Sequence, residues 1–179
     1  MLSIILIGLA AIVVVFVLIV VLRPSAFRVA RSATMAAPAP VVFAQVNDFH
    51  AWEAWNPWGK LDPAIRNTYA GAPAGPGAVF AWVGNRNVGE GRMTILESRP
   101  SELIRIKLEF FKPFAGTNTA EFTFEPEGDR TAVTWCMFGH NAFMAKAIGL
   151  FMDMDKMIGD QFERGLADMK SVVEAMARR

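Results

Sequence analysis

The hydrophobic pattern changes character along the chain. Residues 2–22 are almost continuously apolar, with no charged residue and no proline. From residue 27 to about 138, apolar and polar residues alternate in short runs, which is typical of β-strands with one buried face. From Met154 to Met176 the apolar positions recur with a period near 3.6, which predicts an amphipathic helix. We therefore expect an apolar segment at residues 1–22 and one folded domain at residues 23–179.

The apolar segment is long enough to form a transmembrane helix, since about 20 helical residues cross a hydrocarbon core about 30 Å thick. A cleaved signal peptide is the alternative, but no basic region precedes the segment and its apolar run is unusually long for a signal. Arg23, Arg28 and Arg31 follow it. The positive-inside rule then predicts a single-pass protein of the cell membrane with its domain in the cytoplasm. The three arginines are topology signals in this interpretation, and contact with anionic headgroups is a second possibility.

The alternating runs predict an antiparallel sheet, because they follow one another through hairpin-like turns and keep one apolar face. In the cleanest run, Ile104, Ile106 and Leu108 alternate with charged residues. The expected strands cover residues 27–35, 65–69, 78–83, 88–98, 103–110, 119–125 and 131–138.

Helices are expected before and after the sheet. One short helix opens at Pro38 or Pro40 and runs through Val46, and a second covers residues 49–55 with Asp48 as its N-cap. The long C-terminal helix has to bury its apolar face, and the sheet is the nearest surface that can receive it. These elements predict an α+β sandwich. The apolar face of the last helix is expected to hold Ile158, Phe162, Gly165, Met169, Val172, Val173 and Met176.

The order of these elements resembles the helix-grip fold of the START-like, or SRPBCC, superfamily, and more narrowly bacterial members related to polyketide cyclases and dehydrases. The resemblance rests on residues 36–58 (AAPAPVVFAQVNDFHAWEAWNPW), 75–85 (GPGAVFAWVGN), 89–100 (GEGRMTILESRP), 131–140 (TAVTWCMFGH) and 154–170 (MDKMIGDQFERGLADMK). It implies a curved antiparallel sheet wrapped around the long C-terminal helix, with an apolar cavity between them. The N-terminal transmembrane helix is an addition to the minimal domain. The superfamily carries many activities on one scaffold, so the resemblance is specific for fold and weak for function.

Large apolar side chains supply the candidate binding residues. The chain has five Trp, fourteen Phe and ten Met, which is a high content of large apolar side chains for one small domain. Aromatic walls suit a ligand pocket and methionine adapts to variable shapes, although ordinary core packing is the alternative for each residue. Tyr69, Arg92 and Glu90 are polar candidates, each of which could instead face solvent. The expected ligand-binding residues are Trp55, Trp58, Tyr69, Phe80, Trp82, Met93, Phe110, Phe122, Trp135, Met154 and Phe162.

The sequence offers little support for catalysis, and we assign no catalytic residue. Cys136 and His140 are a conceivable nucleophile and base, but no third group orients them, and a buried strand thiol is usually inert. His50 is interpreted as a solvated or capping residue. Metal ligands are too few and the glycine-rich stretches lack a phosphate-binding signature, so no metal or cofactor is expected. A net charge of +1 argues against a nucleic-acid partner.

Three functions remain open. The leading hypothesis is a non-enzymatic, membrane-anchored protein that binds a small hydrophobic or lipid-like molecule, with the membrane contacted through residues 2–22. The alternative is an enzyme of the cyclase or aromatase kind, which could act largely by shaping a reactive chain. The third is a protein-interaction module similar to co-chaperone domains, which would need an exposed apolar patch.

Overall fold

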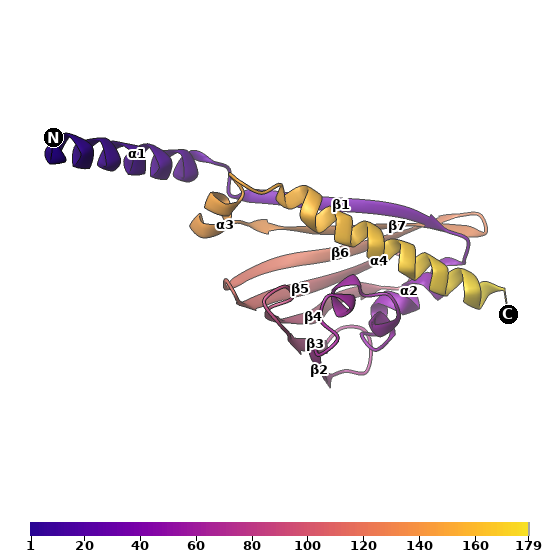
Figure 1. The fold of residues 1–179 in the computed structure, drawn as a ribbon. Helices are drawn as coiled ribbons and strands as arrows, with labels where there is room; N and C mark the ends of the chain where they lie inside the picture. Colours follow the sequence, from indigo (N-terminus) through magenta and orange to yellow (C-terminus); the bar gives the residue numbers. More distant parts are fainter. Residues whose placement is uncertain (179) are drawn as a thin grey trace.

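The apolar segment forms helix α1 (Leu2–Leu22), which extends away from the remainder of the chain in the computed structural model (Figure 1). The structure describes residues 1–178. Nearly all α1 side chains are exposed, and only Val20 is buried. By length and composition α1 could cross a membrane, properties that an anchor shares with a signal sequence.

The domain is α+β, with one seven-stranded sheet in which every neighbouring pair of strands is antiparallel. The spatial order is β1-β7-β6-β5-β4-β3-β2, so the first strand pairs with the last and β2 is the opposite edge. An irregular register at residues 95–97 of β4 leaves Leu96 without a partner, and a bulge of this kind bends a strand. The strands are β1 (Ala26–Met35), β2 (Arg66–Gly71), β3 (Ala78–Val83), β4 (Glu90–Arg99), β5 (Leu103–Lys112), β6 (Gly116–Glu127) and β7 (Arg130–His140).

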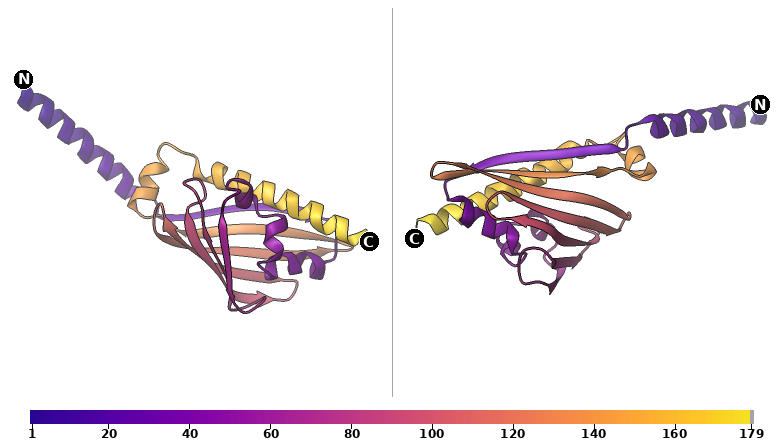
Figure 2. Two further views of the ribbon diagram at one scale, coloured as in Figure 1. Left: turned by 60° about the horizontal axis from the view of Figure 1, so that its bottom comes forward. Right: turned by 180° about the vertical axis from the view of Figure 1, so that it is seen from behind.

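The long helix α4 (Met154–Ala177) lies across one face of the sheet, the concave face, together with helix α2 (Ala39–Asn47) and two 3₁₀ helices (Figure 2). This is a helix-grip arrangement, as the resemblance implied. On β3, Phe80 and Trp82 are buried while the residues between and beside them are not. This alternation confirms that one face of the sheet carries the core.

Most predicted elements are present within a few residues of their expected ends. The exception among the helices is the segment 49–55, which forms the 3₁₀ helix η1 (Ala51–Ala54) and is followed by a second, η2 (Pro57–Lys60). A 3₁₀ helix repeats every three residues, so it aligns Trp52 and Trp55 on one side more closely than an α-helix would. The predicted N-cap is wrong: His50 precedes the helix and makes no side-chain capping bond, while Asp48 accepts a hydrogen bond from the His50 backbone N–H at 2.8 Å before the helix begins.

A short helix that the sequence did not predict, α3 (Phe143–Ile148), follows β7. It lies beside the last turn of α1 (Figure 1). No side chain caps its N-terminus, so it lacks the usual sequence signal of a helix start.

The apolar face of α4 is close to the predicted one. Phe162, Gly165, Met169 and Val173 are buried as expected, and Leu166 is buried as well. Met176, by contrast, is 49% exposed because it lies in the last turn, beyond most of the sheet.

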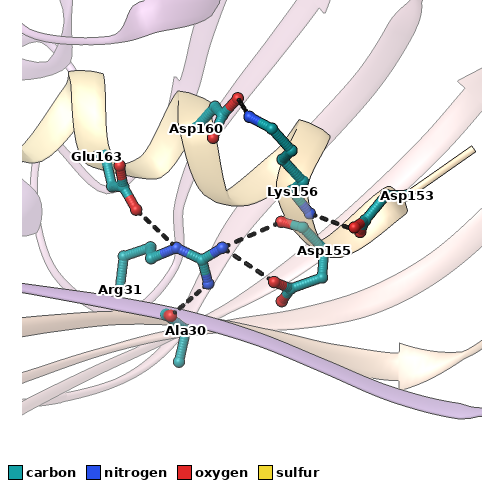
Figure 3. Close-up of polar contacts among 7 residues, drawn as sticks. All are labelled: Ala30, Arg31, Asp153, Asp155, Lys156, Asp160 and Glu163. Atoms are coloured by element: carbon teal, nitrogen blue, oxygen red, sulfur yellow. Dashed lines mark hydrogen bonds and ion pairs between the residues drawn. The ribbon is translucent and has the colours of Figure 1, made fainter.

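An ion-pair network ties the first half of α4 to β1 (Figure 3). The Arg31 guanidinium bonds Asp155 Oδ2 and Glu163 Oε1, each at 2.9 Å. These carboxylates raise the pKa of Arg31, chiefly through the hydrogen bond to Asp155. Gly159 leaves room for the guanidinium, since a Cβ at that position would collide with it. Arg31 therefore serves as a structural link in addition to any role in topology.

Candidate functional site

The space between the centre of the sheet and α4 is filled by aromatic rings in mutual contact. Trp135 of β7 stacks on Phe162 of α4, with ring centroids 4.1 Å apart and planes 9° apart. On its other side Trp135 stacks on Phe122 of β6 at 4.9 Å. Trp52, in η1, and Trp55, the residue after η1, complete the layer. Within this layer, then, protein side chains occupy the region where the resemblance implied a cavity.

One polar atom in this layer lacks a partner. Trp52 and Trp55 donate their indole N–H groups to the carbonyls of Val46 and Gln45, both at 3.1 Å. The indole N–H of Trp135, which is 3% exposed, finds no acceptor among residues 1–178. Leaving such a donor unpaired costs about 1–3 kcal/mol. Trp135 thus presents a buried hydrogen-bond donor that the protein itself does not use.

A second unpaired atom lies on the neighbouring surface of α4. Gln161 Oε1 is buried and accepts no hydrogen bond from any residue between 1 and 178. Gln161 precedes Gly165 by one helical turn, so the two positions share one side of α4. Gly165 meets both Trp135 and Pro57, since a Cβ there would lie 2.9 and 3.0 Å from their side chains. Gln161 therefore lies one helical turn before the contact between Gly165 and Trp135.

On the concave face, side-chain exposure rises slightly toward one end of the sheet. We call this the α1 end, because β1 begins there directly after α1, and the register brings Ala26 opposite His140 and Lys112 opposite Glu90. Along β5 the exposure of inward side chains rises from 0% at Ile104 and Ile106 to 9% at Leu108, and Phe110 is only half-buried. Trp82 (8%) and Met137 (6%) lie at the same end. The opposite end is closed by α2.

The predicted binding residues fall into three groups in the structure. Trp55, Phe122, Trp135 and Phe162 form the central layer, and half-buried Trp58 touches two of them. A second chain of contacts runs along β2, β3 and β5, through Tyr69, Phe80, Trp82 and Phe110, with Met93 beside Phe80 in the neighbouring strand. Met154 lies apart from both groups, at the start of α4.

Met154 lines a surface hollow of about 580 Å³ at the junction of α1, α3 and α4. Arg23, Lys146, Phe151 and Asp153 are among its other lining residues. The hollow is therefore on the α1 side of the domain, and sequence periodicity could not have indicated it because its walls come from segments far apart in the chain.

A smaller hollow of about 200 Å³ opens beside the edge strand β2. His50 and Tyr69 stack at its rim with ring centroids 4.2 Å apart. Asp48 bonds His50 Nδ1 at 2.8 Å, and Tyr69 donates its hydroxyl to Glu53 at 2.7 Å. Burial and this carboxylate raise the pKa of Tyr69, so the phenol stays neutral at physiological pH. Tyr69 is the one polar candidate on the concave side.

The other two polar candidates point away from the interior. Arg92 pairs with Glu109 at 2.8 Å, and Glu90 pairs with Lys112 at 2.7 Å. Lys107 also bonds Glu109, and these two cations lower the pKa of the Glu109 carboxyl. Arg92 and Glu90 thus belong to a charged outer face of the sheet and not to a binding surface inside the grip.

The nucleophilic and metal-ligating side chains do not assemble into a reactive site within the described residues. Cys136 is buried on the face of β7 opposite Trp135, and burial raises the pKa of its thiol. His140 lies four residues further along the strand, about 13 Å away at the usual rise per residue. No group of three His, Cys, Asp or Glu side chains in residues 1–178 could hold a metal ion.

Comparison with solved structures supports the same architecture. A protein from Thermobifida fusca is 25% identical, with a TM-score of 0.61 over 80% of this chain and 90% of its own. The Aha1 dimer from Colwellia psychrerythraea is 12% identical, with a TM-score of 0.59 over 83% of this chain and 96% of its own. The di-domain ARO/CYC StfQ from the steffimycin biosynthetic pathway is 12% identical, with a TM-score of 0.61. The match to StfQ covers 87% of this chain and 53% of that one.

No curated protein matches the sequence. The family model described as polyketide cyclase / dehydrase and lipid transport matches residues 26–174, which is nearly the whole domain beyond α1. The helix-grip sheet, the long C-terminal helix and this match agree. The chain therefore belongs to the polyketide cyclase / dehydrase and lipid transport family.

Proposed function

We propose that this protein is a membrane-anchored binder of a small hydrophobic or lipid-like molecule, held between the concave face of the sheet and α4. The single observation that carries the proposal is the unpaired indole N–H of Trp135 in the centre of an aromatic interior. An apolar ligand with one acceptor oxygen would bury its hydrocarbon part among these rings and accept that hydrogen bond.

The α1 end of the concave face gives such a ligand a route of entry. Leu108, Met137 and Trp82 keep a small exposed fraction there, whereas the central layer is closed. A bound molecule has to separate rings that now touch, and half-buried Trp58 of η2 is one ring that could move aside. The family description, which includes lipid transport, is consistent with this class of ligand.

The expected affinity is modest. Burial of about 250 Å² of apolar ligand surface contributes about 6 kcal/mol at 25 cal/mol/Å². Loss of translational freedom and displacement of the rings offset part of that gain. A dissociation constant of about 40 μM or weaker follows, and an anchor that keeps the domain beside a reservoir of apolar molecules would compensate for it.

Membrane anchoring is the second part of the proposal. Helix α1 has the length and composition of a membrane span, and almost all of its side chains are exposed. Intact mass of the protein purified from membranes after alkaline washing is the direct test. A mass that includes residues 2–22 is expected, whereas a shortened, water-soluble chain would identify α1 as a cleaved signal.

Ligand binding is tested on the full chain by native mass spectrometry from detergent micelles, with organic extraction of whatever is bound. We expect a discrete apolar species on the natural chain. Trp135→Phe keeps one aromatic ring but removes the pyrrole ring with its N–H, so beyond the loss of volume that the control shares it should weaken retention about 2–10-fold, the value of one hydrogen bond. Trp52→Phe is the matched control, because the N–H it removes is already used by Val46.

Two results would count against the binding proposal. A natural chain that is empty and takes up no apolar fluorescent probe would overturn it. Equal retention by Trp135→Phe and Trp52→Phe would remove Trp135 as the donor. The cyclase alternative would be favoured by an acid or base that faces the interior. His50 is exposed beside the edge strand, and His140 lies at the end of β7.

A further inference from the structure

Four large apolar side chains are exposed on α3 and on the segment that links it to α4. Phe143 is 42% exposed, Met144 51%, Phe151 80% and Met152 49%. We call these four residues the collar, because they lie beside the point where α1 meets the domain (Figure 1). Exposure of this kind in a cluster indicates a surface that contacts something other than water.

The collar is attached to the end of α1 by hydrogen bonds to backbone carbonyls. Lys146 Nζ donates to the carbonyls of Val21 and Arg23, both at 3.0 Å, and Arg23 Nη1 donates to the Gly149 carbonyl at 2.7 Å. The last carbonyls of a helix have no donors within the helix, so Lys146 satisfies groups that would otherwise need another partner. The position of α3 is therefore coupled to that of α1.

The aromatic pair of Phe16 and Phe151 fixes the depth of the collar along α1. Their ring centroids are 6.5 Å apart in a stacked arrangement. Phe16 precedes Leu22, the last residue of α1, by six residues, which corresponds to about 9 Å along the helix axis. The 21 residues of α1 are about 31 Å long, which matches the hydrocarbon core with no excess. A bilayer that covers α1 therefore also reaches Phe151.

We infer that the collar is a second membrane-contacting surface whose partner is the lipid leaflet next to the domain. This inference rests on the proposed anchoring of α1. Phe151 and its neighbours lie among the acyl chains, while Arg23 and Lys146 lie at the level of the lipid headgroups, where cations are favoured. The contact holds the domain in one orientation, with the α1 end of the sheet toward the bilayer. That end of the concave face and the hollow of about 580 Å³ then both lie next to the membrane.

The inference is tested by the depth of a fluorophore in reconstituted full-length protein. In a Cys136→Ala background, Phe151→Cys carries an NBD label in vesicles of phosphatidylcholine and phosphatidylglycerol. Some of the lipids carry a nitroxide near the headgroup. Replacement of Phe151 removes its stack on Phe16 but no core contact, because the side chain is 80% exposed, and the apolar label takes the place of the ring. Ile12→Cys on α1 is the positive control, and Asp129→Cys, in the β6–β7 turn at the opposite end of the sheet, is the aqueous control.

Quenching at position 151 at least as strong as that at position 12, with none at position 129, is the expected result, because Phe151 lies level with Phe16 and is therefore nearer the headgroup nitroxide than Ile12 is. Quenching at 12 without quenching at 151 overturns the collar while leaving the anchor intact. Lack of quenching at both positions shows that α1 is not in the bilayer, and the collar then fails together with the anchor. A label at 151 that is shielded both from the lipid nitroxide and from aqueous iodide would identify a protein partner in place of lipid, which also overturns the inference.

Discussion

The central layer of the interior and the α1 end of the concave face are built from the same kinds of side chain, yet their side chains differ in exposed fraction. Around Trp55, Phe122 and Trp135 the rings contact one another on all sides and almost no surface is left to solvent. Toward the α1 end, Leu108 and Trp82 retain some exposure and Phe110 is half-buried. The centre is therefore the more completely closed part of the interior, and the α1 end is the part where the proposed guest molecule would displace the least packing.

Helix α4 shows the same division. Its second half buries Leu166, Met169 and Val173 against the sheet. Its first turn leaves Met157 44% exposed, and the ion pairs of Arg31 link this part of the helix to β1, whereas Phe162 further along is buried in the central layer. Apolar burial is strong and hardly depends on salt, while exposed ion pairs contribute little and are screened. The first turn of α4 is therefore the part of the helix that apolar burial holds least.

Truncation of the central layer should have the largest effect. Trp55→Ala removes a fully buried ring and the hydrogen bond to the Gln45 carbonyl, and should lower the free energy of unfolding by about 3–5 kcal/mol. Urea denaturation followed by circular dichroism measures this loss. Phe143→Ala, on exposed α3, should change stability by less than about 0.5 kcal/mol. Similar losses for the two variants would contradict the distinction between centre and periphery.

Overfilling the contact between α4 and the central layer should have an intermediate effect. In Gly165→Ala the new methyl group would lie 2.9 Å from Trp135 and 3.0 Å from Pro57, and neither rigid ring can yield easily. The cost of overpacking is about 1–3 kcal/mol, and the better helix propensity of alanine returns about 1 kcal/mol. Net destabilisation is expected in the same urea experiment. The control is Gly59→Ala, whose methyl group would meet open space; a Gly165→Ala variant as stable as this control would show that the contact is loose.

Release of the first half of α4 should have the smallest effect on global stability and a clear local one. Arg31→Gln removes both ion pairs to α4 and, because these carboxylates are more than half exposed, should cost less than about 1 kcal/mol. Faster amide hydrogen exchange is expected in residues 155–163 but not in residues 166–173. Lys156→Gln breaks only a pair within α4 and serves as the control. Uniform exchange along the helix in Arg31→Gln would mean that α4 opens as one unit.

Sequence periodicity was sufficient for the sheet and for α4 because local patterns report which side of each element is apolar. The alternation of Ile104, Ile106 and Leu108 with charged residues predicted both the strand and its buried face. The 3₁₀ geometry of η1 and the existence of α3 were not predictable in this way. The first depends on indole N–H groups that reach carbonyls of α2, and the second on Lys146, which reaches α1 across more than 120 residues of sequence.

The candidate site divides in the same manner. Aromatic content and periodicity singled out Trp55, Trp135 and Phe162 as candidate binding residues. They did not indicate which rings would pack in the centre of the interior and which would lie at its more exposed end. The sequence by itself determined the apolar first helix, the antiparallel strands and the amphipathic last helix, because periodicity and the absence of charge are local properties. Only the tertiary structure decided that Trp135 keeps an unpaired N–H and that Phe151 reaches Phe16, because hydrogen-bond partners and ring contacts depend on segments far apart in the chain.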